Sequence, residues 1–422
     1  MQLCFSLYGN YSLHLEEVFP KGHKPGSQNA LRVFMERKPQ IASNILTKME
    51  PMIQKLLEKG TQRHTFVQAI LLDYVEAQAV QDMEKVKQVA DMMKERFPAV
   101  LASREGLRFA CGLFNLLDAK DRKLVIKSLP VAEMATNKIA HLFLIHVANN
   151  LDDTQLTKKK LMHEVLVKID DHIDDLCFRT VLNTTLLPLE VEKNKQSGEL
   201  EYKRNAILTS DELQSMSLFL DKSTAKKDRH VRARELFKIV QKPLEMFFEE
   251  RLSYYLLDVK PNTVMKNLFV ALAANGEAGS SDVVDEMVRQ VQKPYEETAG
   301  VKQLLLGHPV VHRMLKDMIK GEAAASQSAT SDASKDEKEG AEEGKPGKLK
   351  FSATMAKVVL KHFDDAVKGR GVFILLELIE NPATQHLVLK QLKAQKKVLQ
   401  DLAKKDPKAK GLAVLLKKVQ QS

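Results

Sequence analysis

One helical segment recurs along the chain at intervals of about 40 residues, and this recurrence limits the possible folds more than any other feature. Each copy follows a polar or glycine-containing turn and carries apolar residues at nearly every position that would face a core. The copies are "RHTFVQAILLDYV", "EGLRFACGLFNLL", "IAHLFLIHVANNL", "CFRTVLNTTLL", "KPNTVMKNLFVAL", "HPVVHRMLKDMI", "RGVFILLELI" and "KGLAVLLKKV". Equivalent positions are Thr65, Leu107, His141, Arg179, Asn262, His312, Val372 and Leu412, with spacings of 42, 34, 38, 83, 50, 60 and 40 residues.

Each of the three long spacings contains a polar stretch, and without these stretches a period near 40 residues remains. Amphipathic segments such as "QDMEKVKQVADMMKERF" precede the copies and supply a second helix to each repeat. Aromatic residues make up only 6% of the chain and tryptophan is absent, which favours helices over sheets. The sequence therefore predicts an all-α solenoid of about eight helical repeats, each burying its apolar face against its neighbours.

The polar stretches suggest the domain boundaries. We predict N-terminal repeats in 1–188, a polar and partly disordered insertion in 189–230, further repeats in 231–320, a disordered low-complexity loop in 321–350, and C-terminal repeats with a cap in 351–422. Within the insertion, Thr209 and Glu212 form a possible capping box in "TSDELQSMSLFL", so a helix is expected there.

The chain of 422 residues has a formal net charge of +10 and a pI near 9.2, which favours an anionic partner, foremost nucleic acid. Cys4, Cys111 and Cys177 are far apart in sequence and predict neither a disulfide framework nor a zinc cluster. No apolar run is long enough to cross a membrane. The start "MQLCFSLYGN" lacks a basic segment before its apolar residues. We expect a soluble, non-secreted monomer with no membrane partner.

The segment "GHPVVHRMLKDMI" resembles the helix of a pumilio repeat, whose usual form is His-Pro-Tyr-Gly, a variable residue, Arg, two aliphatic residues and Gln. Here His308 and Pro309 stand in place, His312 takes the variable position, Arg313 the Arg position and Lys316 the Gln position. The order of "LYGN", "KDRKLVIKSL", "HLFLIHVANNLDDTQLTKK", "RARELF", "GHPVVH" and "GRGVFILLELI" is similar to that in the Puf-A/penguin-like family, including its C-terminal CPL region. This similarity covers nearly the whole chain.

The resemblance implies a nucleolar protein built as a bent solenoid of pumilio-like repeats. Such a protein would bind structured RNA, and also DNA, through basic surfaces without strong sequence preference. It would act with assembly factors in large-subunit rRNA processing, with translational regulation as a further role. Family members carry a basic tail and several repeats before the "LYGN" landmark, which stands here at Leu7 to Asn10. We therefore expect this chain to lack N-terminal repeats, as a truncated gene prediction, a fragment or a shortened relative.

Pumilio repeats that read RNA place two edge-binding side chains four residues apart on one helix face, with a stacking residue beside the first. The corresponding pairs here include apolar members that cannot bond to a base edge, for example Leu107 with Cys111 and Val372 with Leu376. A code of one base per repeat is therefore lost. In the stacking row, Phe66 and Phe373 could stack on a base if they are exposed, but we expect both to pack in the core. Arg108 and Arg313 are left open between a phosphate contact and a salt bridge between repeats.

Basic runs provide the remaining candidates for RNA binding, because turns of a solenoid align along one edge and can form a basic stripe. The alternative is that these runs are only solvated helix ends. The candidate residues are Arg108, Lys120, Arg122, Lys123, Lys158, Lys159, Lys160, Lys226, Lys227, Arg229, Arg232, Arg234, His312, Arg313 and Lys316.

No pattern predicts catalysis. The segment "DDHIDD" from Asp170 to Asp175 is crowded with carboxylates but lacks a His or Cys partner at ligand spacing, so we interpret it as a hydrated turn. His141 and His146 do not match the zincin spacing, and neither a P-loop nor a nucleophile elbow occurs. We expect no enzyme activity, no metal and no cofactor.

The sequence leaves two functions open. The first is an RNA-binding scaffold for ribosome assembly that contacts phosphates and RNA shape instead of base edges. The second is a HEAT-like or armadillo-like solenoid that binds protein partners without direct RNA contact. Strongly salt-dependent RNA binding would favour the first, because each neutralised phosphate releases counterions.

Overall fold

The computed structural model describes residues 39–187, 189–275, 281–296, 302–332, 350–405 and 410–421. The "LYGN" landmark and Cys4 lie outside these residues. The chain divides into two compact units. Unit 1 consists of Met1–Lys168 and Pro188–Arg232, and unit 2 of Ile169–Leu187 and Ala233–Ser422.

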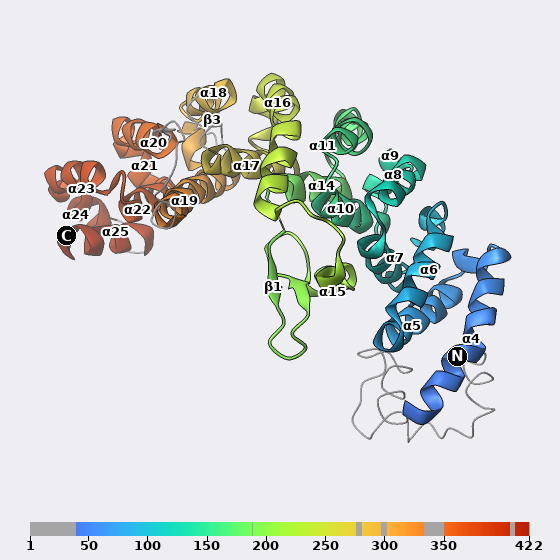
Figure 1. Ribbon diagram of the computed structural model, residues 1–422. Coiled ribbons are helices and arrows are strands. Elements are labelled where there is room, and N and C mark those ends of the chain that lie inside the picture. Colours follow the sequence, from blue (N-terminus) through green and yellow to red (C-terminus); the bar gives the residue numbers. More distant parts are fainter. Residues whose placement is uncertain are drawn as a thin grey trace, which may run out of the picture. The chain divides into compact units, whose positions relative to one another are not determined.

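Unit 1 is built from short helices with one inserted hairpin (Figure 1). Its first part contains α4 (Pro39–Glu58), η1 (Thr61–Arg63), α5 (Thr65–Gln81), α6 (Met83–Met93), η2 (Phe97–Val100), α7 (Arg104–Leu116), α8 (Ala119–Ser128) and α9 (Val131–Thr136). Then follow α10 (Ala140–Asn150), α11 (Thr154–Leu156), the π-helical turn η3 (Thr157–Met162) and α12 (His163–Leu166).

The helices α5, α7 and α10 form one layer of unit 1, since α7 contacts both α5 and α10. The helices α4, α6 and α9 pack against this layer. The layer buries large apolar side chains where its helices meet: Leu71, Phe114 and Phe143 are 0% exposed. Polar caps start the helices, as at Ser103, whose hydroxyl accepts a hydrogen bond from the backbone N–H of Gly106 at 3.0 Å.

The insertion (residues 189–230) is described throughout and is folded, although the sequence suggested partial disorder. It contains the antiparallel hairpin of β1 (Val191–Lys193) and β2 (Leu200–Tyr202), then α15 (Ser210–Met216) and η4 (Leu220–Lys222). The capping box of Thr209 and Glu212 is present at the start of α15, as predicted. Tyr202 is 4% exposed, Met216 0% and Leu220 2%, so a few apolar residues are enough to anchor the segment.

Unit 2 is also helical. It contains α13 (Ile169–His172), α14 (Leu176–Leu186), most of α16 (Arg229–Tyr255), α17 (Val259–Ala274), α18 (Asp282–Gln290) and the hairpin of β3 (Pro294–Glu296) with β4 (Lys302–Leu304). These are followed by η6 (Leu305–Gly307), α19 (Pro309–Asp332), α20 (Lys350–Lys361), α21 (Phe363–Lys368), α22 (Val372–Glu380), α23 (Gln385–Ala394), α24 (Lys396–Lys405) and α25 (Lys410–Gln421).

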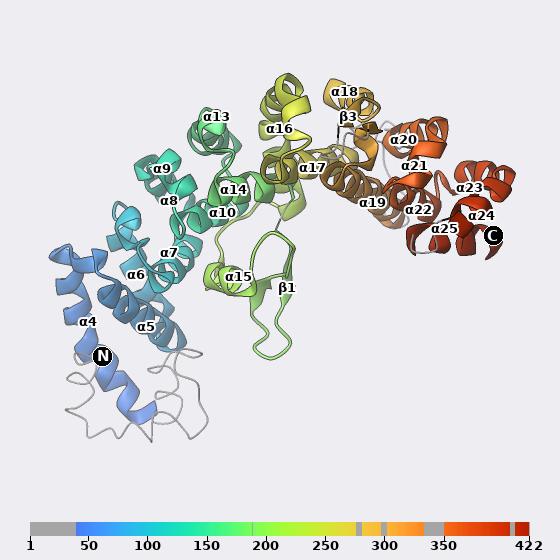
Figure 2. The same cartoon turned by 180° about the vertical axis from the view of Figure 1, so that it is seen from behind.

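Consecutive repeats of unit 2 stack through one helix each, in the order α14, α17, α19, α22 and α25, as both views show (Figures 1 and 2). The helices α20 and α23 pack behind this row. Together with α5, α7 and α10, these are the eight recurring helices of the sequence, so the predicted all-α helical-repeat fold is confirmed.

Helix α19 continues to Asp332, past residue 321, where the sequence suggested that a disordered loop begins. The extra turns carry Glu322, which is only 4% exposed and accepts a hydrogen bond from the backbone N–H of Ser352 at 2.8 Å. This buried carboxylate therefore holds the start of α20. The remainder of the predicted loop, residues 333–349, lies outside the described residues.

Candidate functional site

Three basic runs that are distant in sequence lie near the turn that precedes α11 in unit 1. From α8, Lys123 places its Nζ 2.9 Å from Oδ2 of Asp153. From the end of the insertion, Lys227 places its Nζ 2.9 Å from Oγ1 of Thr154. The third run lies on η3, which packs against α8. We call this surface the basic turn and define it by Lys120, Lys123, Lys158, Lys159, Lys226 and Lys227.

The amines of the basic turn lie at the protein surface. Lys120, Lys158, Lys159 and Lys226 are exposed, the side chain of Lys123 is 50% exposed, and Lys227 is half-buried. Five of the six amines are thus exposed, on segments that lie near the same turn. Such an arrangement can bind several phosphates at once.

Asp152 fixes the end of the insertion to the same turn. Its carboxylate accepts hydrogen bonds from the backbone N–H of Lys226 at 2.8 Å and from Nη2 of Arg232 at 2.5 Å. Burial raises the pKa of this carboxyl, but the hydrogen bonds from Lys226, Arg232 and Lys227 outweigh burial and hold the pKa below its usual value. The carboxylate is therefore charged near neutral pH and offsets part of the local positive charge.

The structure contradicts the prediction that Arg122 and Arg232 contact RNA. Arg122 is 3% exposed, and its guanidinium donates to the backbone carbonyl oxygens of Phe114, Asn115 and Asn150 at 2.9 to 3.2 Å. Arg232 is 4% exposed and donates to the carbonyl oxygens of Leu151 and Asn149 as well as to Asp152. Both side chains donate hydrogen bonds to backbone carbonyl oxygens at helix ends inside the protein. They therefore cannot reach an external phosphate.

Three other predicted residues do not join the basic turn. Lys160 forms an ion pair with Glu164 at 2.5 Å. The guanidinium carbon of Arg229 lies 6.0 Å from the ring centroid of Tyr202. Arg234 is exposed but belongs to unit 2.

The insertion covers the face of α7 on which a base-reading repeat would display its edge-binding side chains. A Cβ built at Gly112 would lie 2.7 Å from Cδ2 of Leu218, so the insertion touches the α7 backbone itself. The amide of Asn115 donates to the carbonyl oxygen of Leu218 at 2.9 Å. Leu107 and Cys111 are 0% exposed. Burial raises the pKa of the Cys111 thiol, which keeps it protonated.

Arg108 is engaged within unit 1. Its Nε donates to Oε1 of Glu76 on α5 at 2.6 Å, and its Nη1 donates to the carbonyl oxygen of Gln214 on α15 at 3.0 Å. Of the two alternatives that the sequence left open, the salt bridge between repeats is the one present.

A buried polar cluster holds the hairpin of the insertion against α7 and α10. The imidazole of His146 is 3.1 Å from Oδ1 of Asn115 and 3.2 Å from the hydroxyl of Tyr202, which also accepts a hydrogen bond from Asn150 at 2.7 Å. Burial, reinforced by the charges of Arg122 and Arg229, lowers the pKa of His146 to about 3. The ring is therefore neutral, donating from Nε2 and accepting at Nδ1.

In unit 2, the predicted residues lie on α19. His312 is 8% exposed and its ring bonds to the backbone carbonyl of His308 at 3.1 Å, whereas Arg313 is exposed. Lys316 lies 3.5 Å from Oε2 of Glu377 on α22. The expectation that Phe373 packs in the core is wrong, because 38% of this residue is exposed.

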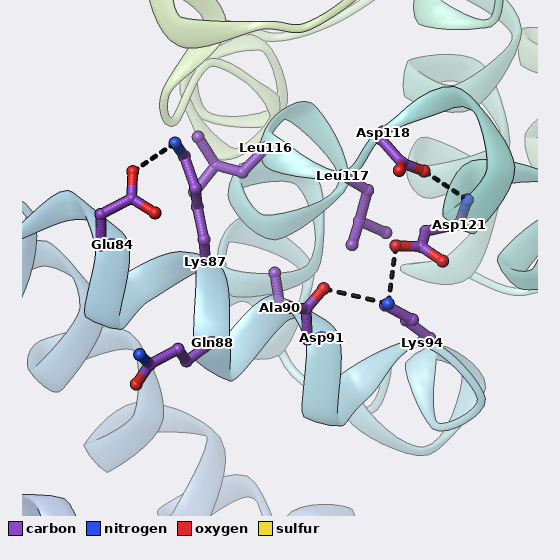
Figure 3. A pocket seen from close by; sticks show the side chains of 10 residues that line it. All are labelled: Glu84, Lys87, Gln88, Ala90, Asp91, Lys94, Leu116, Leu117, Asp118 and Asp121. Carbon is purple, nitrogen blue, oxygen red and sulfur yellow. Dashed lines mark hydrogen bonds and ion pairs between the residues drawn. The ribbon is translucent and has the colours of Figure 1, made fainter.

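A surface cleft of about 320 Å³ lies between α6 and the α7–α8 turn of unit 1 (Figure 3). Its charged groups pair with one another: Lys94 is 2.6 Å from Asp121 and 3.0 Å from Asp91, and Lys87 is 2.6 Å from Glu84. Asp118 accepts a hydrogen bond from the backbone N–H of Asp121. Four acidic residues outnumber two lysines in the lining, so the cleft does not favour an anion.

The acidic "DDHIDD" segment also has structural partners. Asp170 forms an ion pair with Arg251 at 2.9 Å, and Asp175 caps α14 by accepting from the backbone N–H of Phe178 at 2.9 Å. Among the described residues, no group of three or more His, Cys, Asp or Glu side chains is arranged to hold a metal ion. In the same part of the chain, no helix has the length and apolar character needed to cross a membrane.

The chain is similar to known proteins over most of its length. Residues 204–331 match the CPL (NUC119) domain. Pumilio homolog 3 of Rattus norvegicus is 22% identical over 421 residues, which cover 99% of this chain and 58% of the rat protein. Protein penguin of Drosophila melanogaster is 28% identical over 121 residues, which cover 28% of this chain and 16% of the fly protein. The chain thus spans little more than half the length of the rat protein.

A solved structure has the same fold. The crystal structure of human Puf-A in complex with DNA matches with a TM-score of 0.69 and 18% sequence identity. The match covers 99% of this chain and 73% of the human chain.

Proposed function

Because the chain belongs to the Puf-A/penguin-like family of pumilio-repeat proteins, we propose that it binds structured RNA through its phosphates and does not read the base sequence. It acts by binding, without catalysis. The human relative was crystallised with DNA, which supports a nucleic acid as the partner. DNA is a second ligand of the same surface, because the phosphate chemistry is shared.

The observation that carries this proposal is the basic turn. Six lysines from α8, η3 and the insertion meet around the Asp152–Thr154 turn, and five of them are exposed. A lysine ammonium is a compact charge on a flexible stem, so it binds phosphate without selecting a base. The insertion further covers the reading face of α7, which leaves the edge of unit 1 for nucleic acid.

Salt titration of binding to a stem-loop RNA tests the proposal. Six lysine–phosphate contacts predict a slope of log affinity against log salt of roughly −4 to −5. Replacing the six lysines of the basic turn with glutamine should make the slope shallower by about 3 or more. A matched control replaces six exposed lysines on α23, α24 and α25 with glutamine, which changes the net charge equally. The control residues are Lys390, Lys393, Lys396, Lys397, Lys404 and Lys410.

Two results would contradict the proposal. One is wild-type binding that barely changes between low and physiological salt. The other is an equal loss of affinity in the basic-turn variant and the control, which would mean that only net charge matters. Circular dichroism of both variants confirms that the helices persist.

We also propose that the bound RNA is a large-subunit ribosomal precursor, and that the protein works in the nucleolus alongside assembly factors. This assignment comes from the family resemblance. Its test is sedimentation of a tagged chain with precursor particles in a nuclear extract. The wild-type chain should sediment with the particles and the basic-turn variant should not. Equal sedimentation of both proteins would show that association with the particles does not depend on the basic turn.

A protein partner is supported by a different surface. On α16, Met246 is 62% exposed and Tyr254 68%, and just after the helix Leu257 is 43% exposed, so these side chains form a short apolar stripe at the surface. We propose that this stripe contacts an assembly factor. A Met246→Glu, Tyr254→Glu variant should lose factors that co-purify after nuclease treatment, while its stem-loop RNA affinity stays unchanged. If the same factors co-purify with the variant, the stripe is not the surface that contacts them.

A further inference from the structure

The acidic "DDHIDD" segment borders the apolar stripe of Met246, Tyr254 and Leu257 in unit 2. An ion pair of 2.9 Å joins Asp170 of α13 to Arg251 of α16. Arg251 precedes Tyr254 by three residues, so the two side chains lie within one turn of the same helix. Two features that are far apart in the chain therefore meet on one surface.

Glu250 lies between the two helical members of the stripe. Each residue of an α-helix is rotated by about 100° from the last, so Met246 and Tyr254 lie about 40° to either side of Glu250. The carboxylate of Glu250 is 2.8 Å from the guanidinium of Arg251, which also lies over the Phe247 ring at 4.8 Å from its centroid. The acidic segment and the stripe thus share one cation.

A buried aromatic cluster supports the exposed ring of Tyr254. Its centroid is 5.1 Å from that of Tyr255, which in turn stacks on Phe247 at 5.5 Å with an interplanar angle of 25°. Tyr255 is 7% exposed and Phe247 6%, whereas Tyr254 is 68% exposed. The Tyr254 ring is therefore supported on one side and open to a partner on the other.

The acidic segment adds charge and an apolar side chain to this surface. Burial raises the pKa of the Tyr255 hydroxyl, and while Arg251 lowers it, the negative charges of Asp170 and Asp174 raise it further. Both aspartates therefore face α16. Leu176, two residues after Asp174, is 69% exposed.

The surroundings of the stripe are negative, although the whole chain has a formal charge of +10. Lys242, one turn before Met246, is paired with Glu245 at 3.1 Å. Just after Leu257, Asp258 and Lys260 offset each other in charge. The remaining carboxylates outnumber Arg251, so the surface attracts cations. We call them the acidic face, which consists of the exposed residues Asp170, Asp171, Asp174, Glu249 and Glu250.

We propose that this surface docks a lysine-rich or arginine-rich amphipathic segment of a protein partner. Apolar side chains of the segment pack on Met246 and Tyr254, and its cations meet the acidic face. The same carboxylates repel nucleic acid and anionic lipid. The inference rests on the assembly-factor contact proposed above for the stripe, and it adds the chemistry of that partner.

Tryptophan fluorescence measures docking at the stripe. The chain contains no tryptophan, so Tyr254→Trp places a single indole on this surface. The probe is a short helical peptide with leucines along one face and lysines on the other. Its binding should bury the indole and shift the emission to shorter wavelength. The matched control is Val80→Trp on α5, where the native side chain is 66% exposed and no shift is expected.

Affinities of the same peptide give the second readout. Converting the acidic face to the corresponding amides should weaken binding by at least about tenfold, because the charge pairs are lost. Met246→Ser with Tyr254→Ser should weaken it by about tenfold through the loss of apolar anchors. A matched control converts five exposed aspartates elsewhere in unit 2 to asparagine and should bind as the wild type does. The control residues are Asp282, Asp285, Asp364, Asp365 and Asp401. Circular dichroism confirms that the helices persist in each variant.

Four results would overturn the inference. An equal shift with a glutamate version of the peptide would mean apolar contact without selection for charge. An equal shift with oligouridine would assign the surface to nucleic acid. A concentration-dependent shift without peptide would assign it to a second copy of the chain. Equal weakening in the acidic-face variant and its control would mean that only net charge matters.

The docking surface and the RNA-binding function fail separately. The acidic-face variant should keep the salt slope of stem-loop RNA binding, and the six-lysine variant of the basic turn should keep the peptide-induced shift. Salt-insensitive RNA binding together with peptide docking would refute the RNA-binding function alone. Loss of co-purifying factors in Met246→Glu, Tyr254→Glu without docking of the lysine peptide would keep the assembly-factor contact and refute its basic chemistry.

Discussion

Arg122 is a cation that stabilises the fold instead of binding a ligand. Its three backbone carbonyl partners lie at the ends of α7 and α10, where intrahelical donors are lacking. Burial lowers the pKa of its guanidinium to about 10, a value at which the group is still charged at neutral pH. Truncating it leaves three buried carbonyls without this donor.

We therefore predict that Arg122→Ala lowers the free energy of unfolding by about 3 kcal/mol, and that the folded variant binds stem-loop RNA as the wild type does. Urea denaturation and a binding titration at low temperature measure the two effects. The neighbouring exposed Lys120→Ala should change stability by less than about 0.5 kcal/mol. Lost RNA affinity in a folded Arg122→Ala protein would show that the side chain reaches RNA after all.

Asp73 on α5 makes unit 1 sensitive to pH. Burial, together with the negative charges of Glu76 and Glu105, raises the pKa of its carboxyl from 3.8 to about 7. Between these two pH values the folded state keeps a proton that the unfolded state has lost. Its contribution to stability is therefore complete below about pH 4 and disappears as the pH rises through 7.

Replacing this carboxyl with a neutral amide should remove the effect. In Asp73→Asn, the free energy of unfolding should depend less on pH between 4 and 7. At pH 8 the variant should be more stable than the wild type, on the order of 1 to 2 kcal/mol. Urea denaturation over this pH range provides the measurement. If the free energy of unfolding depends on pH in the same way in both proteins, the raised pKa of the Asp73 carboxyl is contradicted.

At the scale of elements, the repeat helices were predictable and the insertion was not. The helices follow one another with a period that the apolar residues reveal, and Thr209 with Glu212 marks the start of α15. The insertion, in contrast, is held by hydrogen bonds between residues that are far apart in sequence. Asn115 donates to Leu218, and Thr224 donates to Asn115, across more than 100 residues of sequence. No local pattern predicts such contacts, so the same basic run contains exposed Lys226 and buried Arg232.

Displacing the insertion should expose α7. A side chain at position 112 collides with Leu218, so Gly112→Leu should push α15 and η4 away from α7. Cys111, which is 0% exposed, should then react with a thiol reagent at least about tenfold faster, as mass spectrometry of the labelled peptide measures. Lys195→Ala, on the exposed hairpin loop, serves as control. Unchanged Cys111 reactivity in a folded Gly112→Leu protein would mean that the insertion does not shield this helix.

For the whole molecule, the family and the repeat fold could be predicted because they depend on many residues. The binding residues could not be separated from structural ones of the same type. Lys123 and Arg122 are adjacent in sequence, yet helical rotation exposes one and buries the other. Phe373 and Phe66 occupy the same repeat position, but only the folded chain shows that Phe373 is exposed and Phe66 half-buried. Sequence thus predicts the fold better than it predicts which cations stay exposed.

The covered face of α7 and the lysine chemistry of the basic turn lead to a prediction about specificity. Phosphates repeat identically along every duplex, so the chain should bind stem-loop RNAs of equal length and scrambled stem sequence with affinities within about threefold. Competition titrations at one fixed salt concentration measure this range. The loop is kept identical in all RNAs, so that its unpaired bases contribute equally to every affinity. A preference of about a hundredfold for one stem would require contacts to base edges, each worth roughly 1–3 kcal/mol, and would contradict phosphate-only recognition.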